Sequence, residues 1–245
     1  MHGRVVAVVG ATGAIGSAVC REFAAAGAAC VVTYRRDQSA AARLIESLPG
    51  SGHWSAHADV EDRHTLDEVA ASIAARHGRL DALVNCAGTT RFVPHQDLDG
   101  LDDELIDRIF RVNWRGPFAA IRACRALLAA GDGGLVINVS SMAGTTALGS
   151  NVAYCASKAA VDSMTKSLAR ALAPSIRVVS LAPGLVDTDF VKGIDAAWRD
   201  DQIRRTPMGR LATPAEIGAA ALAIATHFPF STGCMFPVDG GRHLV

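Results

Sequence analysis

Short apolar runs alternate with helical segments along nearly the whole chain of 245 residues, and this alternation limits the folds that the chain can adopt. Apolar or β-branched runs, which favour strands, occur at residues 5–9, 29–34, 53–58, 80–84, 135–139, 176–181 and 234–237. Segments with helical periodicity lie at residues 15–26, 39–48, 62–77, 102–112, 117–130, 152–172 and 214–226. A polar stretch without clear periodicity covers residues 187–208.

Consecutive strands that are joined through helices pair in parallel, and the helices then cover both faces of the sheet. Strands that are buried on both faces are apolar throughout, as these runs are. Half of the residues are hydrophobic, which supplies a large core, and no linker or repeat divides the chain. The sequence therefore predicts a single α/β domain over residues 1–245, with three layers and a doubly wound, seven-stranded parallel sheet.

Composition argues against several classes of partner. The chain has 24 Lys plus Arg and 24 Asp plus Glu, so its balanced charge gives no reason to expect binding to nucleic acid or to an anionic membrane. The six cysteines are too widely spaced for a metal clip and the eight histidines are scattered, so no metal site is predicted. The sequence shows neither a leader pattern nor an apolar stretch of membrane length, and we expect a cytoplasmic protein.

A glycine-rich turn follows the first predicted strand and opens the first helix. It reads Gly10-Ala11-Thr12-Gly13-Ala14-Ile15-Gly16. Such a turn lets the backbone approach a pyrophosphate, and the N-terminus of the helix adds free N–H groups and a positive dipole. The position of the turn predicts a dinucleotide site, with an ordinary tight turn as the alternative.

The end of the second strand distinguishes NAD from NADP. An acidic residue there would hydrogen-bond the ribose 2′-hydroxyl of NAD. Here the strand ends at Tyr34 and is followed by Arg35 and Arg36, whose guanidinium groups could bind a 2′-phosphate. The sequence favours NADP(H) over NAD(H). In the alternative, both arginines are solvated and Asp37 binds the ribose.

Tyr154 and Lys158 lie four residues apart in the predicted helix 152–172 and therefore project from one face. A nearby cation stabilises a phenolate, which would lower the pKa of the tyrosine and suit it to proton exchange. Alone, this spacing is typical of an ordinary surface pair. Ser141 lies thirteen residues before Tyr154, and Asn113 directly follows the predicted helix 102–112.

In this order and spacing the motifs resemble the short-chain dehydrogenase/reductase family, in its single-domain Rossmann-fold branch, over nearly the whole chain. The resemblance is carried by the glycine loop, the Asn-Cys-Ala-Gly turn at 85–88, the Tyr-x-x-x-Lys element and Val238-Asp239-Gly240-Gly241. It implies that Tyr154 is the general acid and base and that Lys158 also binds the nicotinamide ribose. Ser141 would then bind the substrate oxygen, and Asn113 would hold a water in a proton relay to Lys158.

The resemblance also implies cofactor contacts beyond the glycine loop. These are Asp59 and Val60 at the adenine, Asn85, Ala87 and Gly88 in the turn after the fourth strand, and Pro183, Gly184, Val186 and Thr188 toward the nicotinamide. Some positions depart from the family pattern: Val9 and Ala14 in the loop, Cys86 in the turn, and Val179 in the sixth strand. The spacing of the loop glycines is closer to the extended branch, which has a larger C-terminal domain. Only about 60 residues follow Pro183, so the single-domain assignment is kept.

Substrate specificity is expected in residues 145–152 and in the stretch 187–208, which could form a lid. The lid's apolar residues are Phe190, Val191, Ile194, Trp198 and Ile203. Its arginines, Arg199, Arg204 and Arg205, either face an anionic substrate or are solvated.

The predicted function is the NADP(H)-dependent interconversion of a small-molecule ketone and a secondary alcohol. The chain is also similar to 3-oxoacyl-[acyl-carrier-protein] reductases, so reduction of a 3-oxoacyl thioester is an alternative. Segments 129–132 and 173–175, however, lack the basic residues that would dock an acidic carrier protein. A third alternative is a dinucleotide-binding regulator without turnover. The resemblance further implies a homotetramer or homodimer, built on the helices around Asn113 and Tyr154.

Overall fold

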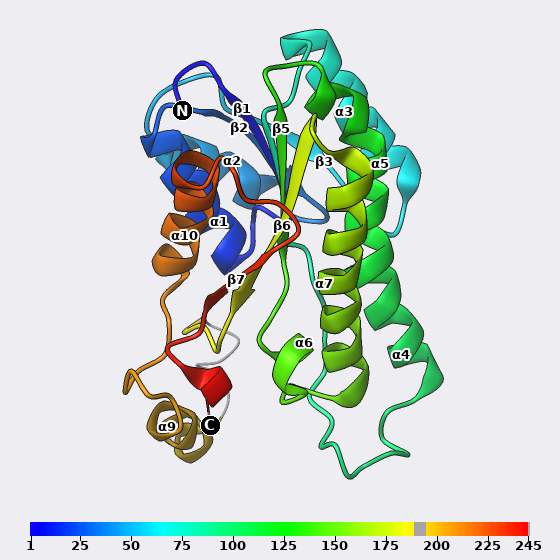
Figure 1. Ribbon diagram of the computed structural model, residues 1–245, viewed down its shortest axis with the longest axis vertical. Coiled ribbons are helices and arrows are strands. Elements are labelled where there is room, and N and C mark those ends of the chain that lie inside the picture. The colour runs from blue at the N-terminus through cyan, green and yellow to red at the C-terminus, as the bar shows by residue number, and fades with distance from the viewer. Residues whose placement is uncertain (189–194, 245) are drawn as a thin grey trace.

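The computed structural model describes residues 1–188 and 195–244 and shows a parallel sheet between two layers of helices (Figure 1). The strand order is β3-β2-β1-β4-β5-β6-β7. The strands are β1 Val5–Val9, β2 Ala29–Tyr34, β3 Trp54–His57, β4 Ala82–Asn85, β5 Gly134–Val139, β6 Ile176–Pro183 and β7 Met235–Val238. The predicted doubly wound, seven-stranded sheet is therefore confirmed. Its order reverses between β1 and β4, and such a switch point leaves a crevice at the carboxyl ends of the strands.

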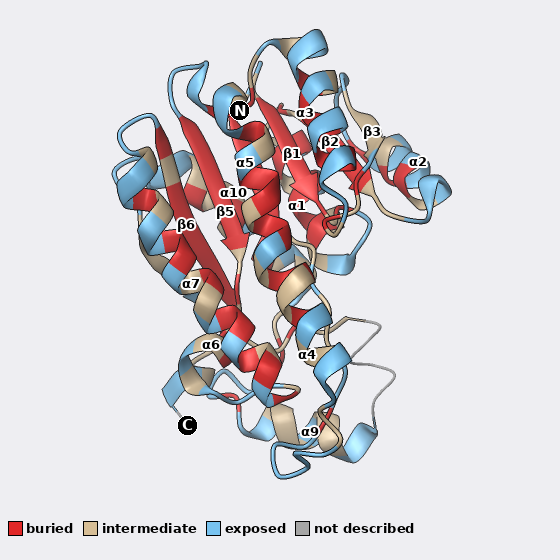
Figure 2. Ribbon diagram, turned by 90° about the vertical axis from the view of Figure 1, so that its right-hand side faces the viewer, coloured by how far each residue is buried: buried red, intermediate tan, exposed pale blue. Residues whose placement is uncertain are grey.

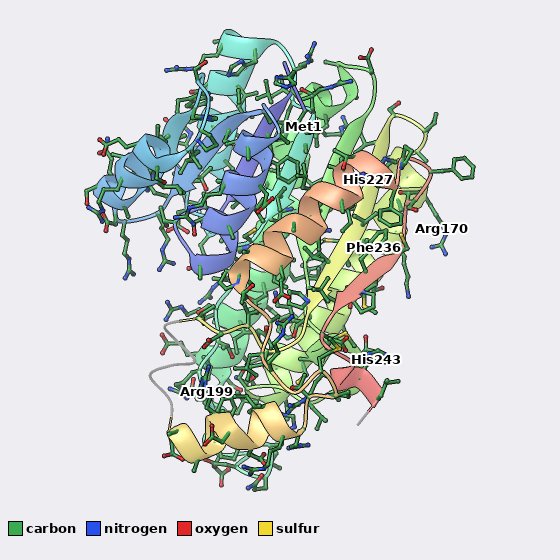
Figure 3. The ribbon with its side chains drawn as sticks, turned by 90° about the vertical axis from the view of Figure 1, so that its left-hand side faces the viewer. Met1, Arg170, Arg199, His227, Phe236 and His243 are labelled. Atoms are coloured by element: carbon green, nitrogen blue, oxygen red, sulfur yellow. The ribbon has the colours of Figure 1, made fainter. Side chains whose placement is uncertain are left out.

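Helices cover both faces of this sheet. One layer holds α1 Ala14–Ala25, α2 Gln38–Ser47 and α10 Pro214–His227, and the other holds α3 Arg63–His77, α5 Gly116–Ala129 and α7 Val152–Leu172. Figure 3 shows α1 and α10 side by side, and a Cβ on Gly218 of α10 would lie 2.8 Å from the carbonyl oxygen of Ala18 in α1. Glycine is thus required for this close approach of the two helices.

The central strands are buried on both faces, as Figure 2 shows by their colour. In β1, Val6 and Val8 join the core under α1 and α10, while Val5 and Ala7 join the core under α3 and α5. The helices are buried only where they face the sheet, so their outer surfaces carry the polar residues. This pattern explains why the strand runs are apolar without alternation.

The two helices predicted at 102–112 and 117–130 form one continuous helical run. It consists of α4 Asp103–Phe110, a π-helical segment η1 Arg111–Arg115, and α5. Pro117 explains the irregularity, because it has no N–H to donate to the carbonyl of Asn113 four residues earlier. The wider π turn places Asn113 in a buried position beside α7.

The stretch 187–208, predicted to be irregular, contains the helix α9 Ala196–Arg204. Asp195 caps α9 by accepting a hydrogen bond from the backbone N–H of Trp198. The helix buries none of its residues, which is why the sequence shows no amphipathic periodicity there. Trp198 and Ile203 lie on α9, whereas Phe190, Val191 and Ile194 lie outside the described residues. Two further short elements are α6 Ala143–Thr146 and the 3-10 helix η2 Arg242–Leu244. Of the helices described, none is both long and apolar enough to cross a membrane.

Candidate active site

A cavity of about 250 Å³ lies at the carboxyl ends of β1, β2 and β4, next to the glycine loop. It contains a first group of the predicted cofactor residues: Gly10, Thr12, Gly13, Tyr34, Arg35, Val60, Ala87 and Gly88. Val9, Thr33, Ala58, Cys86, Thr89 and Val112 also line it. Of this second group, Val9 and Cys86 belong to motifs noted in the sequence, whereas the other four were not predicted and only lie next to predicted residues or strands.

The other predicted cofactor residues do not line this cavity: Ala14, Ile15, Gly16, Arg36, Asp59, Asn85, Tyr154, Lys158, Pro183, Gly184, Val186 and Thr188. Two of them have structural partners. The Asp59 carboxylate accepts a hydrogen bond from the Glu61 backbone at 2.9 Å, and the Asn85 amide donates to the Asn138 side chain at 2.9 Å. Asn85 therefore ties β4 to β5 under the cavity.

The glycine loop is shaped for close approach. Gly10 has φ +83°, and a Cβ there would lie 2.7 Å from the backbone nitrogen of Ala87. The Thr33 hydroxyl accepts from the Gly10 N–H at 3.1 Å and donates to the Val8 carbonyl at 2.9 Å, which fixes the loop to β2. Gly13 is the N-cap of α1 and has no side chain to occupy the free N–H groups of the first turn. These groups and the positive end of the helix fit a pyrophosphate, so the residues present suit a dinucleotide.

Arg35 lines the cavity where β2 ends. Its guanidinium lies 3.9 Å from the Glu61 carboxylate, which also contacts Arg111 at 3.4 Å. Asp37, the alternative ribose ligand, instead caps α2: its carboxylate accepts from the Ser39 hydroxyl at 2.6 Å and from the Ala40 N–H at 2.9 Å. These hydrogen bonds lower the pKa of Asp37. Asp37 does not line the cavity, whereas Arg35 does.

Tyr154 and Lys158 share one face of α7, as their spacing predicted, with the Lys158 nitrogen 5.7 Å from the centre of the tyrosine ring. Lys158 is 6% exposed, and its Nζ donates to the Val139 carbonyl at the end of β5, at 2.9 Å. Ser141 follows β5 two residues later, and its hydroxyl accepts from the Ala143 N–H at 3.1 Å. With one lone pair so occupied, the Ser141 hydroxyl still has its own hydrogen to donate.

Burial governs the ionisation of this pair. It raises the pKa of Tyr154, and the hydrogen bond with Ser141 only partly offsets this. Burial also lowers the pKa of Lys158 to about 8, against the opposing effects of Asp162 and Cys86. The expectation that Lys158 lowers the pKa of Tyr154 is therefore wrong: the pKa is raised, and desolvation is the largest cause.

Asn113 is buried, and both polar atoms of its side-chain amide are hydrogen-bonded. Its Oδ1 accepts from the Thr89 N–H at 2.8 Å, and its Nδ2 donates to the Thr89 carbonyl and the Ser157 hydroxyl, each at 3.1 Å. Gly88 faces this cluster: a Cβ there would lie 3.6 Å from Asn113 Oδ1 and 3.8 Å from Lys158 Nζ. Gly88 also lines the cavity, so the cavity and α7 meet at this turn.

The family model described as "Enoyl-(Acyl carrier protein) reductase" matches residues 10–243, nearly the whole chain. The chain belongs to the short-chain dehydrogenase/reductase family. It is 33% identical over 246 residues to the D-threitol dehydrogenase of Mycolicibacterium smegmatis, covering 98% of this chain and 93% of that protein. It is 31% identical over 245 residues to a 3-oxoacyl-[acyl-carrier-protein] reductase of Thermotoga maritima, covering 98% of each.

A solved structure supports the same assignment. A short-chain type dehydrogenase/reductase from Mycobacterium ulcerans superposes with a TM-score of 0.91 at 27% identity, over 100% of this chain and 91% of that one. The protein is thus a short-chain dehydrogenase/reductase enzyme with a Rossmann-like fold, and its family uses NAD or NADP. The relatives act on both polyols and ketoacyl groups, so membership alone does not define the substrate.

The arginines near the predicted lid are paired with acidic residues. Arg199 contacts Asp187 at 3.0 Å, and Arg204 and Arg205 contact Asp201 at 3.2 Å and 3.9 Å. The charge of Arg199 is therefore offset by Asp187, whereas Arg204 and Arg205 share the single carboxylate of Asp201. Among the described residues, no cluster of three or more His, Cys, Asp or Glu is arranged to hold a metal ion.

Proposed function

We propose that this enzyme interconverts a ketone and a secondary alcohol with NADP(H), using Tyr154 as the proton donor in reduction and the proton acceptor in oxidation. The observation that carries the proposal is the meeting of the dinucleotide cavity with Lys158 and Asn113 at Gly88. NADPH, when bound, supplies the hydride. The protein must then hold the carbonyl and deliver one proton to its oxygen.

The proposed roles follow from the donors and charges of the site. The Ser141 hydroxyl donates to the substrate oxygen and stabilises the charge that develops there. Tyr154 gives its phenolic proton to the same oxygen, and the Lys158 cation stabilises the phenolate that remains. Asn113 supports a water in the relay to Lys158, since Pro117 leaves its carbonyl without the usual helical donor.

The surroundings of Tyr154 favour an uncharged substrate with an apolar body. Three exposed apolar side chains lie in the segments on either side of it: Phe92, Leu148 and Val152. Of the arginines near the lid, Arg199 is paired with Asp187 at 3.0 Å. A 3-oxoacyl thioester is the second candidate because one relative is such a reductase, but segments 129–132 and 173–175 offer no basic dock.

A screen of NADPH oxidation over small ketones, β-keto esters and acetoacetyl thioesters tests the proposal. We expect turnover with at least one neutral ketone. Preference for the thioesters would favour the second candidate. Cofactor binding without turnover of any of these substrates would favour a regulatory dinucleotide-binding protein instead.

Arg35→Ala is expected to weaken NADPH binding by about 10- to 100-fold, because it removes a charge-assisted contact with the 2′-phosphate. NADH affinity should change little, since NADH lacks that phosphate. Fluorescence titration of both cofactors measures the two affinities. The matched control is Arg43→Ala on α2, which removes the same charge from an exposed arginine outside the cavity. Tighter binding of NADH than NADPH by the wild-type enzyme would contradict the assignment.

The rate of carbonyl reduction is expected to fall as pH rises through about 8. Lys158 has a pKa of about 8 in the folded protein, so it carries its charge below that pH and loses it above. Burial raises the pKa of Tyr154, so the tyrosine keeps its proton over the same range. A profile of kcat/KM for NADPH between about pH 6 and pH 10, at saturating ketone, measures the effect, because kcat/KM reports the groups of the free enzyme. A flat profile across this range would exclude Lys158 as the titrating group.

A further inference from the structure

Asn151 occupies a position at the start of the catalytic helix that the proposed chemistry leaves unexplained. It is completely buried and is the N-cap of α7, because its Oδ1 accepts from the Tyr154 N–H at 2.7 Å. Its Nδ2 crosses to the segment that follows β4. There it donates to the Arg91 carbonyl at 2.8 Å and to the Thr90 hydroxyl at 3.2 Å.

These contacts belong to a closed ring that returns to Tyr154. Thr89 is joined to Asn113 by two hydrogen bonds, and Asn113 donates to the Ser157 hydroxyl. The Ser157 hydroxyl donates to the carbonyl of Tyr154 at 2.8 Å. The backbone of Tyr154 is therefore held at its N–H through Asn151 and at its C=O through Ser157. Both paths lead to residues 89–91.

The ring joins the catalytic helix to a wall of the dinucleotide cavity, because Thr89 lines that cavity. A second pair of contacts strengthens the same link: the Val93 N–H donates to the Ser150 carbonyl at 2.8 Å, and the Thr90 and Ser150 hydroxyls lie 2.5 Å apart. Asn151, Asn113 and Ser157 are all buried. Loss of one partner in such a network leaves a buried polar group unpaired, which is destabilising.

We propose that Asn151 is a positioning residue, which fixes Tyr154 against the Thr89 wall of the cavity and so aligns the phenol with the carbonyl to be reduced. The proposal rests on the catalytic role proposed for Tyr154. A helix cap needs only the Oδ1 acceptor, which serine, aspartate or asparagine can supply. The bridge through Nδ2 to Arg91 and Thr90 is the part that only the amide provides.

Asn151→Ser separates the helix cap from the bridge. Serine keeps an oxygen that can cap α7, but its side chain is too short to reach Arg91 and has no amide to donate. We expect kcat for ketone reduction to fall about tenfold, since small misplacements of a catalytic group have effects of this size or larger. The dissociation constant for NADPH should change less than about threefold, because the loop at Gly10–Gly16 is not touched. The control is Asp62→Ala, which removes the cap of α3 and so lowers stability at a place away from the ring. Its kcat should equal that of the wild type.

Hydrogen exchange gives a readout that does not need turnover. In Asn151→Ser we expect faster exchange in residues 89–93, including the Val93 N–H, while the amides of 154–157 keep their protection. Wild-type kcat in Asn151→Ser, or an equal loss of kcat in Asp62→Ala, would overturn the proposal. Unchanged exchange in 89–93 would overturn it as well. If the wild-type enzyme reduces no ketone, the proposed function fails, and exchange alone then decides whether Asn151 ties the two segments.

Discussion

Tyr154→Phe is expected to lower kcat for ketone reduction by about 10²- to 10⁴-fold, the usual range for loss of a general acid. Phenylalanine keeps the ring and its packing against α7 but has no proton to give to the substrate oxygen. The backbone N–H and C=O of residue 154, which Asn151 and Ser157 hold, are unchanged by this substitution. Steady-state kinetics with a ketone identified by the substrate screen measure the loss.

The chain supplies its own matched control for this experiment, because it has only two tyrosines. Tyr34→Phe removes the same hydroxyl from the lining of the cavity, where Tyr34 lies beside Arg35. It should leave kcat close to the wild-type value. NADPH affinity should be retained in Tyr154→Phe, since Tyr154 does not line that cavity. Full activity of Tyr154→Phe would remove Tyr154 from the mechanism, and a comparable loss in Tyr34→Phe would point to general damage instead.

Elements whose signals are local were predicted well from the sequence. Helix α7 begins and ends where expected, at Val152 and Leu172, because Asn151 caps its start and the Pro174 segment follows its end. The strands were recognised because burial on both faces demands unbroken apolar runs. Helix α9 was not predicted because it buries no residue, and a helix without a buried face has no apolar periodicity in its sequence.

Features that depend on distant partners could not be read from the sequence. The hydrogen bond from Asn151 to Thr90 joins residues 61 positions apart, and no periodicity encodes it. Likewise Thr33 and Thr89 line the dinucleotide cavity because of where β2 and β4 end in space. Pro117 was the one residue in the sequence that indicated the π segment at Asn113. A proline is equally common at the start of a new helix, so the sequence alone could not distinguish the two.

Ion pairs and pKa shifts were the features that the sequence predicted least well. The i, i+4 spacing of Tyr154 and Lys158 correctly placed both on one face of α7. The direction in which the tyrosine pKa shifts depends on burial, however, and spacing carries no information about burial. Arg199 could not be assigned from the sequence to a substrate or to solvent. In the fold it pairs with Asp187, twelve residues earlier.

Gly16→Ala is expected to destroy the dinucleotide site. A Cβ on Gly16 would press against the carbonyl of Gly10 and would lie 2.8 Å from the Cα of Ala11. Both neighbours are backbone, so the first turn of α1 must move away from the loop. Overpacking of this kind lowers the free energy of unfolding by about 1–3 kcal/mol. The displaced N–H groups would then no longer point at the pyrophosphate. We therefore expect NADPH affinity to fall by about 100-fold or more, which corresponds to the loss of one or two charge-assisted hydrogen bonds.

Gly13→Ala is the matched control for Gly16→Ala, because it adds the same methyl group to the same loop. Its nearest neighbour would be the Gly10 carbonyl oxygen at 3.5 Å, an ordinary contact, and Gly13 has φ −76° and ψ 165°, which alanine adopts freely. The unfolding free energy should therefore stay within about 0.5 kcal/mol of the wild type. Chemical denaturation and NADPH titration of both variants separate packing from binding. If Gly13→Ala keeps its stability but binds NADPH more weakly, the backbone at Gly13 is where the cofactor approaches the loop. If Gly16→Ala binds NADPH as the wild type does, the loop at Gly10–Gly16 is not the phosphate site.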